Sequence, residues 1–272
     1  MINTPRITVI MGIYNCADTL VEALESLEAQ TYKSFKVVLC DDGSIDSTFK
    51  EAKRWAETHL NYIVIKNEHN IGLNATLNRC LEYADTEFIA RMDGDDRSLP
   101  HRFELEVDFL DKHPEYAIVS GPMYYFDNNG MFRKGKGRGA VTKRDFIIGT
   151  PFCHAPCMVR REAYEKVGYY SVDPKLLRVE DYHLWFKMYA VGYKGYMLEE
   201  PIYEMRDDRN AVARRTLKSR LNETYVMHIG YRMIGLPWWT QIYCMLPIMK
   251  GLIPMWLYNL LRRKIDWNSV IK

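Results

Sequence analysis

Strand-like and helix-like segments alternate over the first 120 residues of this 272-residue chain, and this alternation limits the fold more than any other feature. Apolar runs predict strands at residues 7–13, 35–40, 62–66, 88–92 and 117–120, and amphipathic stretches predict helices at residues 17–30, 47–59, 72–84 and 100–113. Such an alternation is typical of a mostly parallel sheet with helices on both faces. The sequence therefore predicts an α/β fold.

The fourth predicted strand ends abruptly in three carboxylates, Asp93, Asp95 and Asp96. Open α/β sheets bind their ligands at the carboxyl ends of the strands. Carboxylates packed this closely repel one another, and a divalent metal that carries a phosphate group is a suitable counter-charge. An acidic turn ahead of a helix that begins near Pro100 is the alternative explanation.

Two further polar patterns follow predicted strands. Tyr14 and Asn15 follow the first strand, where a ring can stack on a base and an amide can bond to a base or ribose; the start signal of the next helix explains them equally well. Asp41 and Asp42 follow the second strand. A carboxylate there can accept a hydrogen bond from the imide N–H of a uracil or thymine ring, and a capped turn is the alternative.

Another acidic pair, Glu180 and Asp181, leads into an apparent helix that carries Leu184, Trp185 and Met188. One acid suits the cap and the dipole of that helix. An ordinary Asp is ionised at pH 7, so Asp181 can take a proton from an attacking hydroxyl. Taken alone, the pair does not decide between a helix cap and a general base.

Together these segments resemble the family 2 glycosyltransferases, which are inverting, nucleotide-sugar-dependent enzymes with the Rossmann-like GT-A fold. The resemblance extends over about residues 5–210. Its matching pieces are residues 9–15, 41–44, 70–78, 93–95, 100–102, 158–160 and 180–185 and an expected strand at residues 203–206, together with His154. Gly12 stands where the family often has proline, which loosens that turn without removing a functional group.

The resemblance implies a role for each candidate residue. It implies that Asp42 contacts the uracil and that Asp93 approaches the ribose. It also implies that Asp95 ligates Mg²⁺ or Mn²⁺ at the diphosphate and that Asp181 is the general base of a direct, inverting displacement. Asp96 is expected to support the turn. The residues expected to bind the nucleotide-sugar are Tyr14, Asn15, Asp42, Asn70, Asp93, Gly94, His154 and Glu180. For His154 and Arg206, contacts to phosphate or acceptor are weighed against a buried structural role for His154 and a surface role for Arg206.

Charge and hydropathy divide the chain into two parts. Residues 206–272 hold 12 Lys and Arg against 4 Asp and Glu, a net charge of +8, which leaves −6 for residues 1–205. Residues 236–261 are almost uncharged, rich in Trp and Tyr, and interrupted by three prolines, and Arg262, Arg263 and Lys264 follow them. This composition favours helices lying in the lipid headgroup region; a true membrane span and a soluble packing or dimer surface are the alternatives.

We therefore expect a catalytic domain over residues 1–210 and a basic, aromatic-rich helical extension over residues 211–272 for membrane or acceptor docking. Six scattered cysteines and the lack of a signal peptide before Ile7 predict a cytoplasmic protein. The basic tail predicts peripheral attachment to the inner face of the cell membrane. A turn is expected at residues 128–130. A basic loop is expected at residues 135–139, where the glycines lack the spacing of a phosphate-binding P-loop.

The resemblance also implies a reaction. The donor is expected to be a UDP-hexose or UDP-N-acetylhexosamine, and the acceptor a hydroxyl of an undecaprenyl-diphosphate-linked saccharide in capsule, O-antigen or exopolysaccharide synthesis; no nucleic-acid partner is expected. A catalytically silent nucleotide-sugar-binding scaffold at the membrane is one alternative. A sugar nucleotidyltransferase is the other, and it requires a glycine-rich, arginine-containing loop that does not follow the first strand here.

Overall fold

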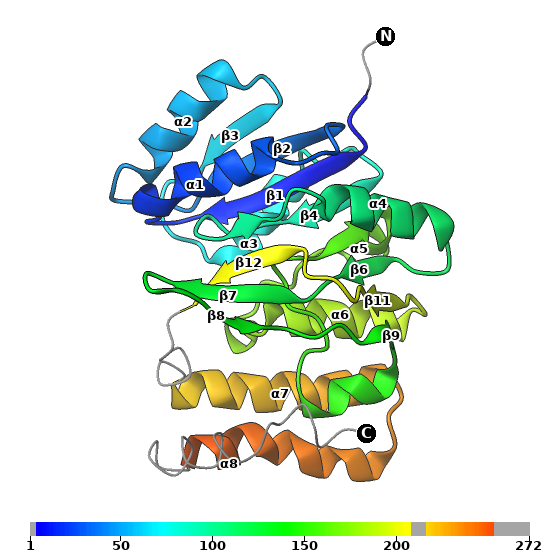
Figure 1. Ribbon diagram of the computed structural model, residues 1–272. Coiled ribbons are helices and arrows are strands. Elements are labelled where there is room, and N and C mark those ends of the chain that lie inside the picture. The colour runs from blue at the N-terminus through cyan, green and yellow to red at the C-terminus, as the bar shows by residue number, and fades with distance from the viewer. Residues whose placement is uncertain (1–3, 208–215, 253–272) are drawn as a thin grey trace.

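The computed structural model describes residues 4–207 and 216–252 of the chain (Figure 1). In chain order, the first part contains β1 (Ile7–Ile13), α1 (Ala17–Glu28), β2 (Phe35–Asp41), α2 (Thr48–Thr58), β3 (Tyr62–Lys66), α3 (Leu73–Leu81), β4 (Phe88–Arg91), β5 (Arg97–Ser98) and α4 (Arg102–Lys112). The predicted helices and strands of this part are confirmed, with ends that differ by a few residues. For example, α3 begins at Leu73 because Gly72 has a φ of 91°, which is outside the helical region.

Shorter elements follow, including 3₁₀ helices labelled η. They are β6 (Ile118–Ser120), β7 (Met123–Asp127), β8 (Gly130–Lys134), β9 (Gly139–Val141), η1 (Lys143–Ile148), β10 (Met158–Arg160), α5 (Arg161–Val167), η2 (Pro174–Leu176), α6 (Glu180–Ala190), β11 (Gly195–Met197), β12 (Tyr203–Arg206), α7 (Leu217–Met233), η4 (Trp238–Met245) and α8 (Leu246–Leu252). The predicted strands at residues 117–120 and 203–206 correspond to β6 and β12, and the helix after Glu180 corresponds to α6.

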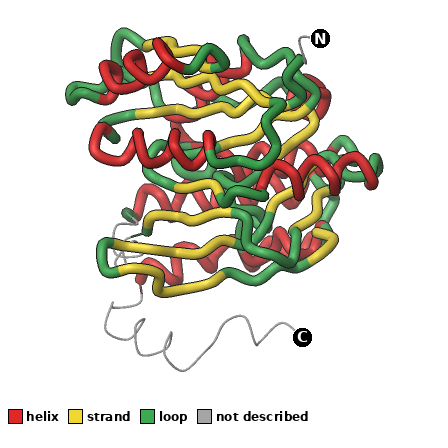
Figure 2. The backbone as a smooth tube through the Cα atoms, turned by 45° about the horizontal axis from the view of Figure 1, so that its top comes forward, coloured by secondary structure: helices red, strands yellow, loops and turns green. Residues whose placement is uncertain are grey.

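An eight-stranded sheet forms the centre of the molecule, in the order β3-β2-β1-β4-β10-β6-β11-β9. The strand β1 lies between β2 and β4 and is parallel to both, with Ile7 opposite Phe35 on one side and Phe88 on the other. The carboxyl ends of these three strands therefore meet at one edge. Farther along, β10 runs antiparallel to both of its neighbours, β4 and β6. Figure 2 shows the strands with helices on either side.

A second, four-stranded sheet in the order β5-β12-β7-β8 was not expected from the sequence beyond the strand at residues 203–206. Its β5 begins at Arg97, directly after the acidic turn, and pairs with β12. The predicted turn at residues 128–130 is confirmed, since it joins β7 to β8 as an antiparallel hairpin. This sheet supports the acidic turn from one side.

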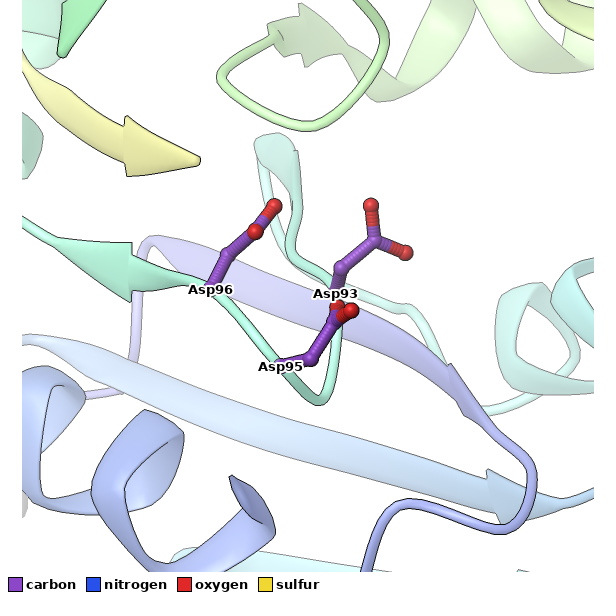
Figure 3. A group of neighbouring side chains, drawn as sticks. All are labelled: Asp93, Asp95 and Asp96. Atoms are coloured by element: carbon purple, nitrogen blue, oxygen red, sulfur yellow. The ribbon is translucent and has the colours of Figure 1, made fainter. Parts of the chain in front are cut away.

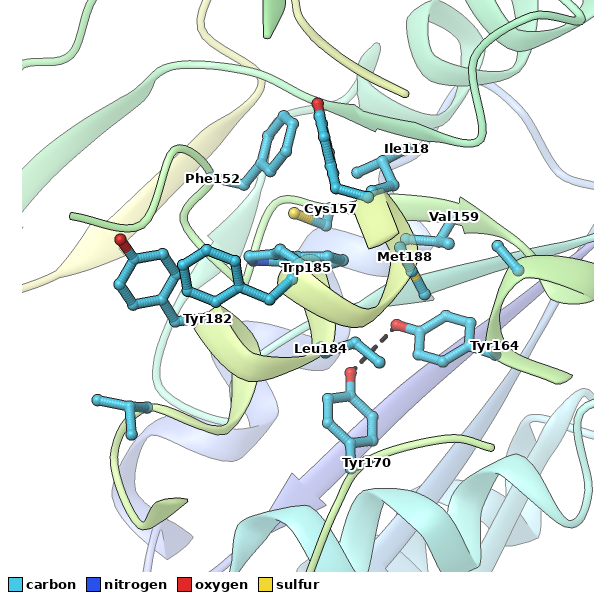
Figure 4. Close-up of a cluster of buried hydrophobic side chains, with 14 of the residues drawn as sticks. Ile118, Phe152, Cys157, Val159, Tyr164, Tyr170, Tyr182, Leu184, Trp185 and Met188 are labelled. Atoms are coloured by element: carbon cyan, nitrogen blue, oxygen red, sulfur yellow. Dashed lines mark hydrogen bonds between the residues drawn. The ribbon is translucent and has the colours of Figure 1, made fainter. Parts of the chain in front are cut away.

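Two hydrophobic cores cover the two faces of the large sheet. Alternate side chains of β1 face opposite cores: Ile10 packs with α3 residues such as Leu77, whereas Val9 packs with α1 residues such as Leu24. The first core extends through α6, where Trp185 is fully buried among aromatic neighbours (Figure 4). Both faces of the strands that end at the site are therefore held by packing.

The described part of the predicted C-terminal extension joins this first core. Val226 and Met227 of α7 are buried in it, and the hydroxyl of Tyr231 donates to the carbonyl of Ile147 at 2.6 Å. Within residues 4–207 and 216–252, no helix combines the length and apolar character needed to cross a bilayer. As far as Leu252, the apolar stretch that begins at residue 236 forms two separate helices, η4 and α8. The rest of this stretch, to residue 261, and the basic residues 262–264 lie outside the described residues.

We predict that Gly230→Ala destabilises the fold, although alanine is the better helix former by about 1 kcal/mol. A Cβ at Gly230 would lie 2.2 Å from the ring of Phe186, which is fully buried in α6. Overpacking of this kind costs about 1–3 kcal/mol, so the midpoint of urea unfolding should fall. Lys218→Ala, at an exposed position of α7, is the control and should leave the midpoint unchanged. A Gly230→Ala protein as stable as the wild type would contradict tight packing of α7 on α6.

Candidate active site

The ends of β1 and β2 are joined through Asn15. The backbone N–H of Asp42 donates to the carbonyl of Ile13 at 2.8 Å, and the side-chain carbonyl of Asn15 accepts from the N–H of Ile45 at 3.0 Å. Asn15 has a φ of 47°, a left-handed conformation that asparagine tolerates better than most residues. Its amide therefore holds the turn after β2, while the neighbouring Tyr14 leaves 47% of its surface exposed.

Asp42 is 4% exposed and organises the loop ahead of α3. Its carboxylate accepts from the N–H groups of Ile71 and Gly72 at 2.8 and 3.0 Å, and from the amide of Asn67 at 2.8 Å. An ionised carboxylate offers about four acceptor positions, so these bonds leave about one for a ligand. The structure thus gives Asp42 a supporting role that the sequence did not reveal.

Asn70 is exposed in the same loop, next to the turn after β2. A Cβ at Gly43 would lie 2.8 Å from the backbone nitrogen of Asn70, and Gly43 has a φ of 73°. Only glycine allows the two loops to approach this closely. The loop that carries Asn70 is therefore brought to the same edge of the sheet as Asp42.

The acidic turn between β4 and β5 contains Asp93, Asp95 and Asp96 (Figure 3). One carboxylate oxygen from each residue lies within 4.8 Å of the others; Asp95 is exposed, Asp93 is half-buried and Asp96 is buried. Gly94 allows the turn to pack closely, because a Cβ there would lie 2.8 Å from the sulfur of Cys16. The structure thus brings together the three carboxylates that the sequence singled out.

Arg91, the last residue of β4, supplies positive charge beside this turn. Its side chain is 4% exposed, and its two terminal nitrogens donate to the two oxygens of Asp93. The remaining nitrogen, Nε, has no hydrogen-bond partner among the described residues. Arg91 is not among the site residues expected from the sequence, although a single arginine in an otherwise apolar strand indicates that it neutralises a nearby acid.

The second sheet fastens the same turn. The carboxylate of Asp96 accepts from the backbone N–H of Arg206 at 2.7 Å, and Nε of Arg206 donates to the carbonyl of Asp95 at 3.0 Å. The hydroxyl of Tyr203 accepts from the N–H of Asp93 at 3.2 Å. These contacts agree with the expected supporting role of Asp96, and they give Arg206 a structural role that the sequence did not settle.

The residues of the acidic turn fit a divalent cation. Desolvation raises the pKa of Asp95, and the negative charge of Asp93 raises it further. Burial, together with the negative charges of Asp93 and Asp95, raises the pKa of Asp96 well above its usual range. The turn therefore lacks positive charge even with Arg91 present, and oxygen ligands are those that Mg²⁺ and Mn²⁺ prefer. Asp95 is the most accessible of the three.

Glu180 and Asp181 form the first turn of α6. Val179 occupies the N-cap position and no side chain caps the helix there, so neither acid is the cap that the sequence left as the alternative, although both lie in the first turn, where they complement the helix dipole. The carboxylate of Asp181 instead accepts from the N–H of Tyr182 at 2.7 Å. Burial raises the pKa of Asp181 to about 7, and the charge of Glu180 contributes. A carboxyl group with this pKa can exchange protons readily near neutral pH.

Arg91 connects the two acidic groups electrostatically. For Asp95, Glu180 and Asp181 alike, desolvation is the largest influence and raises the pKa, while the charge of Arg91 opposes it. Coulombic influence of this kind requires proximity. The charge of one buried guanidinium thus acts on both the acidic turn and the start of α6, which are about ninety residues apart in the chain.

His154 lies behind the site, 8% exposed. Its Nε2 is 2.7 Å from the hydroxyl of Tyr170, and its ring packs against the edge of Trp185. Burial holds the pKa of His154 well below its usual range, with a further contribution from Arg91. This environment favours the buried structural role that the sequence left as the alternative, and a part for His154 in donor binding stays a prediction.

The chain matches the family model described as Glycosyl transferase family 2 over residues 8–168. It is 37% identical to EpsE of Bacillus subtilis over 267 residues, which cover 97% of this chain and 96% of that protein. It is 28% identical to the Escherichia coli UDP-Gal:alpha-D-GlcNAc-diphosphoundecaprenol beta-1,3-galactosyltransferase over 237 residues, which cover 85% of each protein.

Solved structures share the fold. S. aureus TarS in complex with UDP-GlcNAc superposes with a TM-score of 0.67 at 19% identity, covering 84% of this chain and 70% of that one. The mannosyltransferase PcManGT from Pyrobaculum calidifontis, in complex with GDP-Man and Mn²⁺, gives a TM-score of 0.62 at 21% identity, covering 96% and 79%. At such identities the likeness establishes the fold alone. With the family match and the close relative, it shows that this chain belongs to glycosyl transferase family 2 and is a hexosyltransferase with the GT-A fold.

Proposed function

We propose that this enzyme transfers a hexose or N-acetylhexosamine from a UDP-sugar to a hydroxyl of an undecaprenyl-diphosphate-linked saccharide during surface polysaccharide synthesis. The observation that carries the proposal is the acidic turn, where oxygens of Asp93, Asp95 and Asp96 lie within 4.8 Å of one another and Arg91 binds Asp93. Support for the substrates comes from Escherichia coli relatives whose names specify UDP-Gal or UDP-Glc donors and GlcNAc-diphosphoundecaprenol acceptors.

The donor nucleotide lies across the carboxyl ends of β1, β2 and β4 in this proposal. The exposed ring of Tyr14 stacks on the base, and the free acceptor position of Asp42 takes the imide N–H of uracil. Asp93 bonds to the ribose, and Arg91 already holds its carboxylate in place before the donor arrives. Asn15 and Asn70 act by fixing the two loops that border the nucleotide.

Asp95, with Asp93 beside it, would hold Mg²⁺ or Mn²⁺. When bound, such a cation stabilises negative charge on the diphosphate leaving group. The chain keeps the carboxylates in place through the tight packing of Gly94 and through the two contacts of Arg206. These supports orient the ligand oxygens before the donor binds.

Asp181 is the general base in this proposal. It takes the proton of the acceptor hydroxyl, whose oxygen forms a bond to the anomeric carbon while the bond from that carbon to the UDP oxygen breaks. Attack from the face opposite the nucleotide inverts the configuration. The pKa of about 7 suits this role, because the carboxylate is substantially ionised at neutral pH and still basic enough to accept a proton.

Attachment to the inner face of the cell membrane by the C-terminal extension completes the proposal. Large apolar side chains are exposed on η4, where Trp238 is 85% exposed, Trp239 53% and Ile242 73%, and on α8, where Leu252 is 73% exposed. Aromatic side chains of this kind favour the membrane–water interface. A lipid-linked acceptor would then lie beside the enzyme in the bilayer.

Release of UDP from a panel of UDP-sugars, with Mn²⁺ and a lipid-linked acceptor extract, tests the proposed chemistry. We expect Asp181→Asn to lower kcat/KM by about 10²–10⁴-fold, because the general base is lost. The wild-type kcat/KM should rise with pH up to about 7, as Asp181 ionises. Asp108→Asn, at an exposed position of α4, is the control and should retain full activity. Full activity of Asp181→Asn would reject the base, and an inactive wild type would favour the silent scaffold.

We also predict that Asp181→Asn stabilises the fold at alkaline pH. The pKa of Asp181 is about 7 in the folded protein, whereas an Asp in an unfolded chain has a pKa of about 3.9. The folded state therefore binds more protons in this window, and the stability contributed by Asp181 falls as the pH rises from about 4 to 7. The gain in melting temperature of Asp181→Asn should be larger at pH 8 than at pH 5. An equal gain at both values would show that Asp181 is not a desolvated carboxylate.

A further inference from the structure

The loop Gly135–Gly139, between β8 and β9, is held against the protein through its glycines. The N–H of Gly135 donates to the carbonyl of Met123 at 2.8 Å. A Cβ at Gly137 would lie 2.2 Å from the carbonyl oxygen of Leu198, so no side chain fits on this side of the loop. Because Lys and Arg alternate with these glycines, the charged side chains must face away from the protein body.

Three cations line a shallow pocket of about 620 Å³ along this loop. Lys134, Lys136 and Arg138 are all exposed, and Glu199 is the one acid among the lining residues. Lys134 lies over the ring of Tyr124, while Lys136 and Arg138 form no ion pair within the described part of the chain. The pocket is thus a cationic surface with a net charge of +2, and no ion pair with another described residue neutralises Lys136 or Arg138.

The cationic pocket is connected to the exposed tryptophans through η1. The helix η1 contacts both α7 and η4, and Nζ of Lys143 donates to the carbonyl of Ile234 at 2.8 Å. Lys143 lies five positions after Arg138 in the chain, so their Cα atoms are at most about 18 Å apart. Trp238 and Trp239 begin η4, four positions after Ile234. A short path through Lys143 and Ile234 therefore links the exposed cations to the exposed indole rings.

We infer that Lys134, Lys136 and Arg138 bind the phosphate groups of anionic lipids at the membrane surface, while Trp238 and Trp239 enter the headgroup region beside them. A bilayer surface binds both kinds of side chain, because its anionic headgroups attract the cations and its interface favours the indole rings. A free phosphate would bind the cations but would make no favourable contact with the rings. This inference rests on the proposed membrane attachment and adds to it a contact from outside residues 211–272. It places the loop between β8 and β9 against the bilayer.

Sedimentation of the full chain with vesicles tests the inference. The vesicles are phosphatidylcholine alone or phosphatidylcholine with phosphatidylglycerol, at physiological ionic strength. We expect the variant K134Q/K136Q/R138Q to bind the phosphatidylglycerol vesicles at least about tenfold more weakly than the wild type. Glu199→Gln should bind them more tightly, because it removes the acid of the pocket.

The matched control is K50Q/K53Q/R54Q, which removes the same three charges from exposed positions of α2. Figure 1 shows α2 at the end of the molecule opposite α7 and α8, so this control should bind the vesicles like the wild type. Equal weakening in both triple variants would overturn the inference, since net charge alone would then explain binding. Full competition by inorganic phosphate at a concentration that leaves ionic strength unchanged would also overturn it.

Release of UDP in the presence of a water-soluble saccharide acceptor separates this inference from the proposed function. The loop variant alters no residue that we place at the donor or the base, so it should release UDP at the wild-type rate in that assay. If the loop variant binds vesicles like the wild type while the wild type transfers sugar, the inference fails and the proposed function stands. If the wild type transfers sugar but binds neither kind of vesicle, membrane attachment itself is wrong.

Discussion

The rest of the site depends on the ion pair between the buried Arg91 and the half-buried Asp93. The guanidinium lies at the end of a strand whose neighbours on both sides are core elements, so packing fixes its position. Removing one partner of a buried pair leaves an uncompensated charge, which costs more than the pair itself contributes. Even so, the pKa values of Asp95 and Asp181 remain raised, chiefly by desolvation. The fold thus concentrates more negative charge than it neutralises, which is the condition under which a cation and its phosphate ligand bind well.

Local signals account for the part of the fold that could be predicted from the sequence. Strands such as Ile7–Ile13 and the amphipathic helices between the strands can be recognised from the spacing of their apolar residues. This recognition does not require knowledge of the elements they pack against. The second sheet and β10 could not be predicted in this way. β5 has two residues and β10 has three, too few to show a period, and each is defined by partners far away in the chain. The composition of the hydrophobic tail indicated helices, but it did not show that the tail forms two separate ones, η4 and α8.

The candidate site shows the same division. The carboxylates of the acidic turn, of the turn after β2 and of α6 could be predicted because each follows an apolar run or opens a helix. Their partners could not: Asp42 accepts three bonds from a loop whose path only the structure shows, and Tyr203 reaches the turn from the second sheet. The role of Arg91 was not predicted, because the residue lies within a run that only indicates a strand. Hydrogen bonding and burial, which decide how His154 behaves, depend on contacts that no spacing in the sequence encodes.

We propose that Asp95 anchors the cation that holds the donor diphosphate. Anomalous diffraction at the manganese edge, from crystals grown with UDP and Mn²⁺, would locate that cation. We expect a manganese peak about 2 Å from a carboxylate oxygen of Asp95 and in contact with the diphosphate, and no such peak in Asp95→Asn crystals. Ordered UDP with manganese bound away from the acidic turn, or an unchanged peak in Asp95→Asn, would show that Asp95 is not the anchor.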